Sequence, residues 1–132
     1  MPAADVPFAY AILRVVPRVE RGERLNLGVV VFCRQRDFLD LRAQIDAERL
    51  AALAPDLDIA SVRESIEAIR AVVCGEPAGG ALAALPQSER FGWVVAPAST
   101  IIQPSHVHAG LTSDPQATLD RLFDALVTPT GR

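Results

Sequence analysis

The feature that most constrains the fold is a short charged segment between two strongly apolar runs. Residues 17–24 read Pro-Arg-Val-Glu-Arg-Gly-Glu-Arg, and we call them the charged arc. The apolar runs at residues 8–16 and 25–34 are rich in β-branched and aromatic residues, which favour strands. The sequence therefore predicts an antiparallel pair of strands with the charged arc at its tip.

The rest of the chain supplies signals for further strands and helices. A third strand is predicted at Phe38–Ala43, a short helix at Asp46–Leu53, and a loop with a helical turn over 75–87. Apolar residues at helical spacing predict a longer helix with Asp58 as N-cap and Gly75 after its end; they are Ile59, Val62, Ile66, Ile69 and Val73. Two more strands are predicted at Phe91–Ala96 and Ser99–Gln103, and Asp114-Pro115 begins a last helix that buries Leu119, Leu122, Phe123 and Leu126.

This order of elements predicts one α+β domain over residues 1–132. The order β-β-β-α-α-β-β-α favours a mostly antiparallel sheet of four to five strands with the helices packed on one face. We expect residues 1–7 and 128–132 to be flexible termini.

Composition narrows the classes of function. The net charge of −3 argues against nucleic acid as the partner, and no run is long enough to span a membrane. All 13 basic residues are arginine, which excludes a Schiff-base or P-loop lysine. Cys33 and Cys74 lie in apolar contexts typical of free thiols, and no secretory signal is recognisable at the N-terminus, so we expect a cytoplasmic protein.

The charged arc has the residue types of an anion site. Arg18, with Arg21 or Arg24, can form a guanidinium fork for a phosphate or carboxylate, and the glutamates can hold the fork or act as acid–base groups. The alternative is a solvated tip whose charges neutralise one another. Arg14 lies inside an apolar strand and needs a partner, and Gly28 in the next strand predicts a bulge or a close backbone approach.

A second cluster of polar residues lies between Ser88 and Gly110. His106 and His108 would lie on one side of an extended segment, but two ligands without a clear third do not define a metal site, and we expect neither a metal nor a cofactor. A Ser–His nucleophilic pair is a further alternative. Trp93 lies in an apolar segment that favours core packing, with a stacking surface as the alternative.

Two blocks of the sequence resemble a known family. They are Tyr10-Ala-Ile-Leu-Arg14-Val-Val-Pro17-Arg18-Val-Glu20-Arg21-Gly22-Glu23 with Asn26-Leu-Gly28-Val-Val, and Ser88-Glu-Arg90-Phe-x-Trp93 with Ala96-Pro97, Ser99-Thr100, Gln103, Ser105, Val107-His108 and Gly110. Over nearly its whole length the chain resembles a bacterial domain-of-unknown-function family, number three thousand and thirty-seven. The resemblance implies no established activity. It implies that His108 matches a histidine of the family, whereas His106 lies at a position where the family has other residues. It also suggests a HipA-type kinase as a partner.

These observations lead us to expect a regulatory or interaction module that presents an Arg/Glu-rich site to a protein or phosphorylated partner. The alternative is a small enzyme acting on a nucleotide or another phosphorylated small molecule. The residues that we expect to bind the anion are Arg14, Arg18, Arg21, Asn26, Arg90, Ser99, Thr100, Gln103 and Ser105. The candidate acid–base residues are Glu20, Glu23 and His108.

Overall fold

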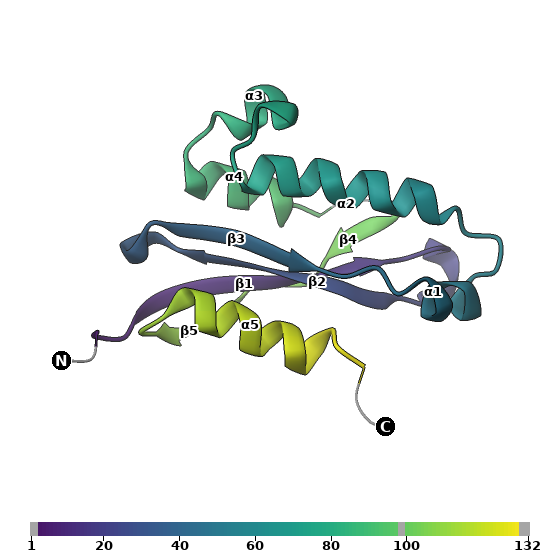
Figure 1. The fold of residues 1–132 in the computed structure, drawn as a ribbon, viewed down its shortest axis with the longest axis horizontal. Helices are drawn as coiled ribbons and strands as arrows, with labels where there is room; N and C mark the ends of the chain where they lie inside the picture. The colour runs from purple at the N-terminus through teal and green to yellow at the C-terminus, as the bar shows by residue number, and fades with distance from the viewer. Residues whose placement is uncertain (1–2, 98–99, 130–132) are drawn as a thin grey trace.

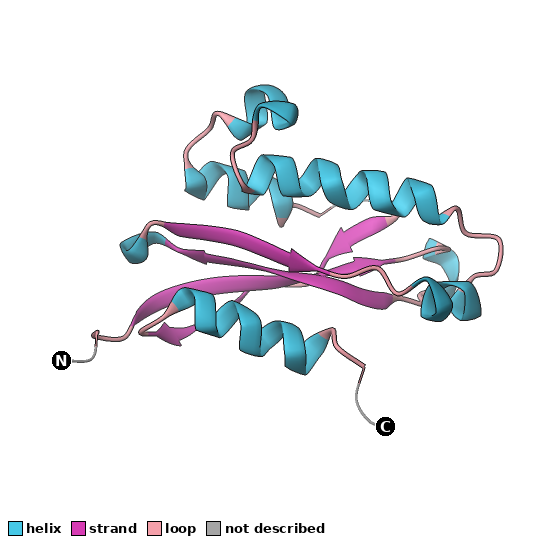
Figure 2. Cartoon of the chain, viewed as in Figure 1, coloured by secondary structure: helices cyan, strands magenta, loops and turns pink. Residues whose placement is uncertain are grey.

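The computed structural model describes residues 3–97 and 100–129, which form a five-stranded antiparallel sheet with helices packed against it (Figure 1, Figure 2). This confirms the α+β class. The strands are β1 Val6–Val15, β2 Leu25–Cys33, β3 Phe38–Ala43, β4 Ile102–Pro104 and β5 His108–Thr112. The α-helices are α1 Ala47–Leu53, α2 Ile59–Val73, α3 Gly80–Ala83, α4 Gln87–Val94 and α5 Pro115–Leu126, and short 3-10 helices lie at Val19–Arg21, Arg34–Arg36 and Pro77–Gly79.

The long strand β1 organises the sheet. Its neighbours follow the order β3-β2-β1-β4, and β5 also pairs with β1. The second edge of β1 is therefore shared: β4 pairs with residues 13–15 and β5 with residues 6–10. Between the two strands, Ile12 N–H donates to Ser105 Oγ at 2.8 Å and Ser105 N–H donates to the Ile12 carbonyl at 2.8 Å. These bonds keep the Ile12 backbone satisfied where the ladder is interrupted.

A bulge changes the faces of β2. The register with β1 shifts between Leu13, which is opposite Gly28, and Arg14, which is opposite Asn26. Leu27 is the extra residue, so it turns to the opposite side of the sheet from its expected alternation. Gly28 also lies against β3, as a Cβ there would be 2.8 Å from the Cβ of Ala43. Both predicted reasons for glycine at this position, a bulge and a close approach, are confirmed.

The helices cover both faces of the sheet, whereas the sequence interpretation placed them on one. Figure 1 shows α2 and α4 on one side and α5 on the other. The buried cluster on the α2 side includes Val30, Val62, Ile66 and Phe91, and the cluster on the α5 side includes Val29, Val31, Cys33, Leu119 and Phe123. The apolar run of β2 has side chains pointing to both faces, and each face needs its own cover.

The boundaries of α2 and the start of α5 follow the predicted capping signals. Asp58 and Asp114 each accept a backbone hydrogen bond at the start of α2 and α5, and Asp46, predicted as the first residue of the short helix, is the N-cap of α1. At the end of α2, Gly75 has a φ of +69° and donates to the Val72 carbonyl, and Glu76 N–H donates to the Ala71 carbonyl. This is a Schellman motif, in which glycine relieves the left-handed backbone of steric strain.

The segment from Phe91 to Ala96 is not the predicted strand, because residues 87–94 form α4. Phe91 and Val94 are buried and Gly92 and Trp93 are exposed, which is the helical rather than the strand period. The Phe91 ring stacks on Phe32 with centroids 5.3 Å apart, so tertiary packing decides this segment against its strand propensity.

The remaining differences lie near the sheet edge and the termini. The short strand expected at 99–103 is β4 at Ile102–Pro104, and the sequence does not predict β5, because His-Ala-Gly-Leu-Thr has little strand signal. β1 begins at Val6, inside the segment expected to be a flexible terminus. Within residues 3–97 and 100–129, the helices are all too short or too polar to cross a bilayer.

Replacing Gly28 with alanine should destabilise the protein, because the new methyl group would collide with the backbone and Cβ of β3. We expect a loss of about 1–3 kcal/mol in the free energy of unfolding, measured by urea denaturation. Gly92→Ala in α4 is the matched control, since nothing lies within 4 Å of its added Cβ. That control should gain up to about 1 kcal/mol, and equal effects of the two changes would contradict the close approach at Gly28.

Candidate functional site: an arginine hollow beside the sheet edge

The charged arc does not face one site but two. Pro17, Arg18, Arg21 and Glu23 line a hollow of about 720 Å³ together with residues 52–58, which are the end of α1 and its connection to α2. That connection contributes the carboxylates of Asp56 and Asp58. The lining of this larger hollow therefore mixes both signs of charge and has no clear preference for an anion.

Arg21 and Glu23 neutralise each other at the tip. Arg21 Nε donates to Glu23 Oε1 at 2.8 Å, and Arg21 Nη2 donates to Glu23 Oε2 at 3.1 Å. This bidentate hydrogen bonding raises the pKa of Arg21 and holds the pKa of Glu23 below its usual value. Both side chains are exposed, so the pair contributes little to stability, and the fork of Arg21 is already occupied.

The second hollow, which we call the arginine hollow, has a volume of about 400 Å³ and lies at the edge of the sheet beside β4. It is lined by Arg14, Val16, Arg24, Val95, Pro97, Gln103, Pro104, Ser105, His106 and Val107. Two guanidinium groups and an imidazole are present, and the described lining includes no carboxylate. In a chain with a net charge of −3, this is a local reversal of sign.

Arg14 is the unusual member of this lining. Its Nε is buried and has no hydrogen-bond partner among the described residues, and no ion pair in that part of the chain includes Arg14. Burial lowers the pKa of Arg14, and repulsion from the charge of Arg24 lowers it further. The partner that the sequence requires for Arg14 is not supplied by the described residues, and the guanidinium is left with unused donors.

The sheet register explains how these residues come together. Arg14 on β1 is opposite Asn26 on β2 and opposite Gln103 on β4, so the three side chains share one face. Arg24 precedes Asn26 by two residues and is therefore the diagonal neighbour of Arg14 on that face. The sequence interpretation names Arg24 only as an alternative to Arg21. The register shift between Leu13 and Arg14 brings Arg24 to the face of Arg14, and regular counting along the hairpin does not give that shift.

The neighbours of Arg14 use their own donors elsewhere. Gln103 Nε2 donates to the Thr100 carbonyl at 3.0 Å, and Asn26 Nδ2 donates to the Leu126 carbonyl at 2.9 Å. Ser105 Oγ accepts from Ile12 N–H and donates to the His106 carbonyl at 2.8 Å. Ser105 is thus a structural residue of the rim rather than a free nucleophile, while His106 is exposed and lines the hollow.

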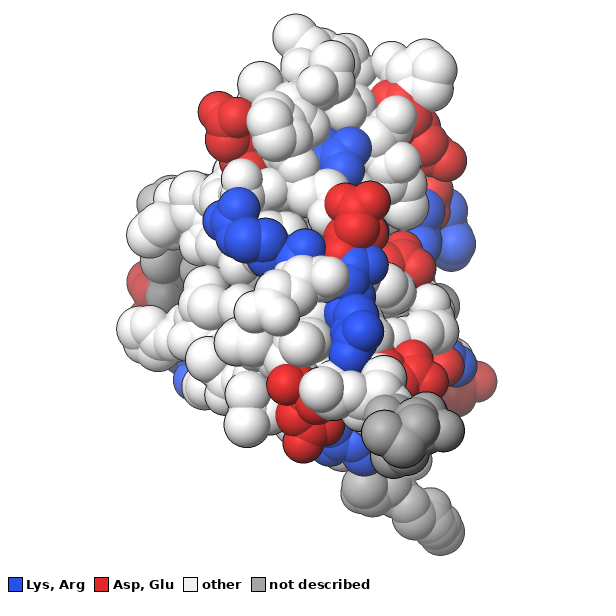
Figure 3. All heavy atoms as spheres, turned by 90° about the vertical axis from the view of Figure 1, so that its left-hand side faces the viewer, with Lys and Arg blue, Asp and Glu red and all other residues white. Residues whose placement is uncertain are grey.

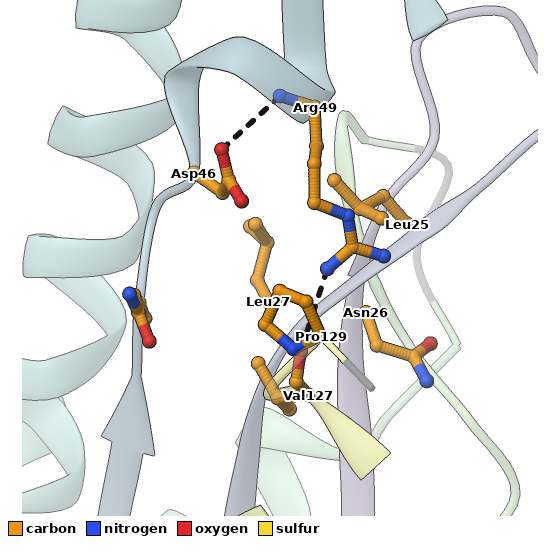
Figure 4. Close-up of a pocket in the computed structure, with 8 residues that line it drawn as sticks. Leu25, Asn26, Leu27, Asp46, Arg49, Val127 and Pro129 are labelled. Atoms are coloured by element: carbon orange, nitrogen blue, oxygen red, sulfur yellow. Dashed lines mark hydrogen bonds between the residues drawn. The ribbon is translucent and has the colours of Figure 1, made fainter. Parts of the chain in front are cut away.

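Asn26 belongs to an anchor for the C-terminal end of α5. Figure 4 shows Arg49 of α1 reaching toward this end, where its Nη1 donates to the Val127 carbonyl at 3.5 Å. The space between Asn26, Arg49 and Val127 is about 10 Å³, enough for one water molecule and too small for a ligand. Asn26 and Arg49 together satisfy carbonyl groups that the helix end would leave unpaired.

The other predicted anion-binding residues lie apart from Arg14 or have structural contacts. Arg90 donates to the Ala83 carbonyl and lies against Gly75, at the opposite end of α2 from Asp58. The length of α2, 15 residues or about 22 Å, separates Arg90 from the arc-facing end. Thr100 Oγ1 donates to the Ile102 carbonyl at 2.7 Å, and Ser99 lies outside the described residues.

The candidate acid–base residues do not meet. His108 is opposite Tyr10 in the sheet, and the two rings stack with centroids 5.1 Å apart. From Tyr10 to Pro17 the chain advances seven residues, about 20 Å in an extended strand, before it reaches the arc that carries Glu20 and Glu23. Proton transfer requires groups within hydrogen-bond reach or one water apart, so these three residues do not form one catalytic set.

Charge is mixed on one end of the molecule. Figure 3 shows basic and acidic side chains interspersed on the end of the molecule that lies at the left of Figure 1. Among residues 3–97 and 100–129, no group of three or more His, Cys, Asp or Glu side chains is arranged to hold a metal ion. The lining of the arginine hollow differs from that surface, since its described residues include two arginines and a histidine and no carboxylate.

The comparison with protein families identifies the chain. The model of the family described as "Protein of unknown function (DUF3037)" matches residues 10–127. The chain belongs to the DUF3037 family. The match covers the residues that form the arginine hollow, from Arg14 to Val107. Comparisons of this DUF3037 protein with curated proteins and with solved structures found no match.

Replacing Arg14 with methionine should not destabilise the DUF3037 protein. The change removes a buried, unpartnered Nε and the repulsion from Arg24, and it keeps the apolar part of the side chain. We expect the free energy of unfolding to stay constant or to rise by about 1 kcal/mol, measured by urea denaturation.

Arg42→Met is the contrasting control for this measurement. Arg42 donates to Asp120 at 2.9 Å and its guanidinium lies 4.4 Å from the centroid of the Phe123 ring. Losing both contacts should cost about 1 kcal/mol. A loss at Arg14 as large as the loss at Arg42 would mean that Arg14 is a structural residue after all.

Proposed function

We propose that this protein is a binding module that takes a phosphorylated group of a partner in the arginine hollow. The observation that carries the proposal is the unpartnered, buried Nε of Arg14 beside Arg24, in a lining without a described carboxylate. Burying a donor without an acceptor costs about 1–3 kcal/mol, and an anionic ligand offsets that cost when it binds.

The number of donors favours a phosphate over a carboxylate. A phosphate monoester has about −1.5 to −2 charges at neutral pH and three acceptor oxygens. Two guanidinium groups offer paired N–H donors in a planar arrangement that suits these oxygens. His106 at the rim of the hollow supplies a third donor.

Binding is better supported than catalysis. The hydroxyl of Ser105 is engaged in two hydrogen bonds, and His108 is remote from the arc glutamates along β1. The described lining of the hollow thus supplies cationic donors without a paired nucleophile and base. The HipA-type kinase suggested by the family resemblance stays a prediction about the partner, and co-purification of the two proteins would test it.

Phosphoserine should stabilise the protein against heat, whereas serine should not. At ten times the dissociation constant, a ligand of the native state adds about 1.4 kcal/mol, which raises the melting temperature by about 4 °C. We expect this shift for the unaltered chain, measured by thermal unfolding at constant ionic strength. Arg14→Met and Arg24→Met should each abolish it.

Arg63→Met on α2 is the charge-matched control, since Arg63 is exposed and outside the lining of the arginine hollow. It should leave the shift unchanged. An equal shift in the Arg14→Met protein would show that phosphoserine binds elsewhere and would refute the proposal.

A further inference from the structure

Another hollow, different from the two described above, adjoins the arginine hollow across β4. It has a volume of about 410 Å³ and is lined mostly by apolar residues of α2, α4 and β4, among them Ala68, Ile69, Trp93, Val94, Ile102 and Pro104. Pro97 and Pro104 line both hollows, so the two share a wall at the sheet edge. We call the apolar hollow that contains Trp93 the tryptophan hollow.

Trp93 gives this hollow its character. The sequence favoured core packing for Trp93, but its side chain is 42% exposed, whereas Phe91 and Val94 on the same helix are buried. A large exposed aromatic side chain beside an apolar hollow leaves a patch of apolar surface in contact with water, which is unfavourable in free energy. Such a surface binds an apolar side chain of a ligand by excluding that water.

The backbone of β4 discourages recognition by strand addition. The Ile102 carbonyl accepts from the Thr100 hydroxyl at 2.7 Å, and Pro104 has no N–H to offer. A partner segment therefore gains few main-chain hydrogen bonds along this edge, and recognition rests on side chains on either side of it.

We infer that the partner of the arginine hollow is a peptide segment of another protein, with a phosphorylated side chain and a large apolar side chain close to it in sequence. The phosphoryl group lies between Arg14 and Arg24, and the apolar side chain lies on Trp93 in the tryptophan hollow. The cationic lining of the arginine hollow is complementary to the phosphoryl group of this peptide, and the apolar lining of the tryptophan hollow is complementary to its apolar side chain. This inference rests on the proposed function and names the partner class for the same site.

The test uses a set of labelled phosphoserine peptides with a leucine at successive positions on either side of the phosphoserine, and binding is measured by fluorescence anisotropy. At the best spacing, replacing the leucine with alanine should weaken binding about tenfold, the equivalent of burying part of one leucine side chain. Replacing phosphoserine with serine should remove measurable binding. Since Trp93 is the single tryptophan of the chain, its emission should also shift to shorter wavelength when the leucine peptide binds.

Two variants separate the two hollows. Trp93→Ala should bind the leucine peptide about as weakly as the alanine peptide, and it should keep its thermal stabilisation by free phosphoserine. Arg14→Met should lose both responses. Because Trp93 is exposed on α4 and Arg14 is unpartnered among the described residues, both variants are expected to fold, and their melting curves verify it.

The outcomes are distinguishable. Binding that depends on phosphoserine but is insensitive to leucine and to Trp93 would overturn this inference and leave the proposed function standing. Equally tight binding of the leucine peptide without its phosphate would also overturn the inference, because it would show that the phosphoryl group is not recognised. Absence of any response to phosphoserine, free or in a peptide, would refute both.

Discussion

The structure depends on β1 sharing one of its edges between two strands. β4 and β5 are short, and neither alone covers the length of β1, so the chain must leave the ladder between them at residues 105–107. The two hydrogen bonds between Ile12 and Ser105 stabilise this departure, because they satisfy the buried N–H and carbonyl groups of Ile12 where the ladder is interrupted. As a consequence His106 and Val107 stand outside the sheet, and they form the rim of the arginine hollow.

Arg14 pairs through its backbone with both β2 and β4, but the described residues supply no acceptor for its side-chain Nε. Its two cross-strand neighbours, Asn26 and Gln103, donate to backbone carbonyls of Leu126 and Thr100, so they serve the anchoring of α5 and of the segment before β4. A domain of this size has a net stability of about 5–15 kcal/mol, and an unpaired buried donor is a noticeable cost against it. A ligand that supplies an acceptor to Arg14 would offset that cost on binding.

Much of the fold could be predicted from local patterns, and the errors have physical causes. The hairpin, the third strand, the capped helices and the bulge at Gly28 follow from periodicity and from single-residue backbone requirements. The segment 87–94 is helical because Phe91 packs on Phe32, a contact that no local signal contains. The site could be predicted only in part: the predicted residues Arg14, Gln103 and Ser105 line it. The sequence names Arg24 as an alternative to Arg21 and His106 as a metal-ligand candidate, and only the register of β1 with β2 and β4 brings them beside Arg14.

The most direct test of the account is the side-chain NMR signal of Arg14. In a spectrum that resolves the arginine Nε–Hε groups, phosphoserine should shift the signals of Arg14 and Arg24, because both would donate to the phosphate. The signal of Arg21, whose Nε donates to Glu23, should stay in place. Shifts confined to Arg18 and Arg21, with Arg14 unchanged at saturating phosphoserine, would contradict the claim that Arg14 belongs to the anion site.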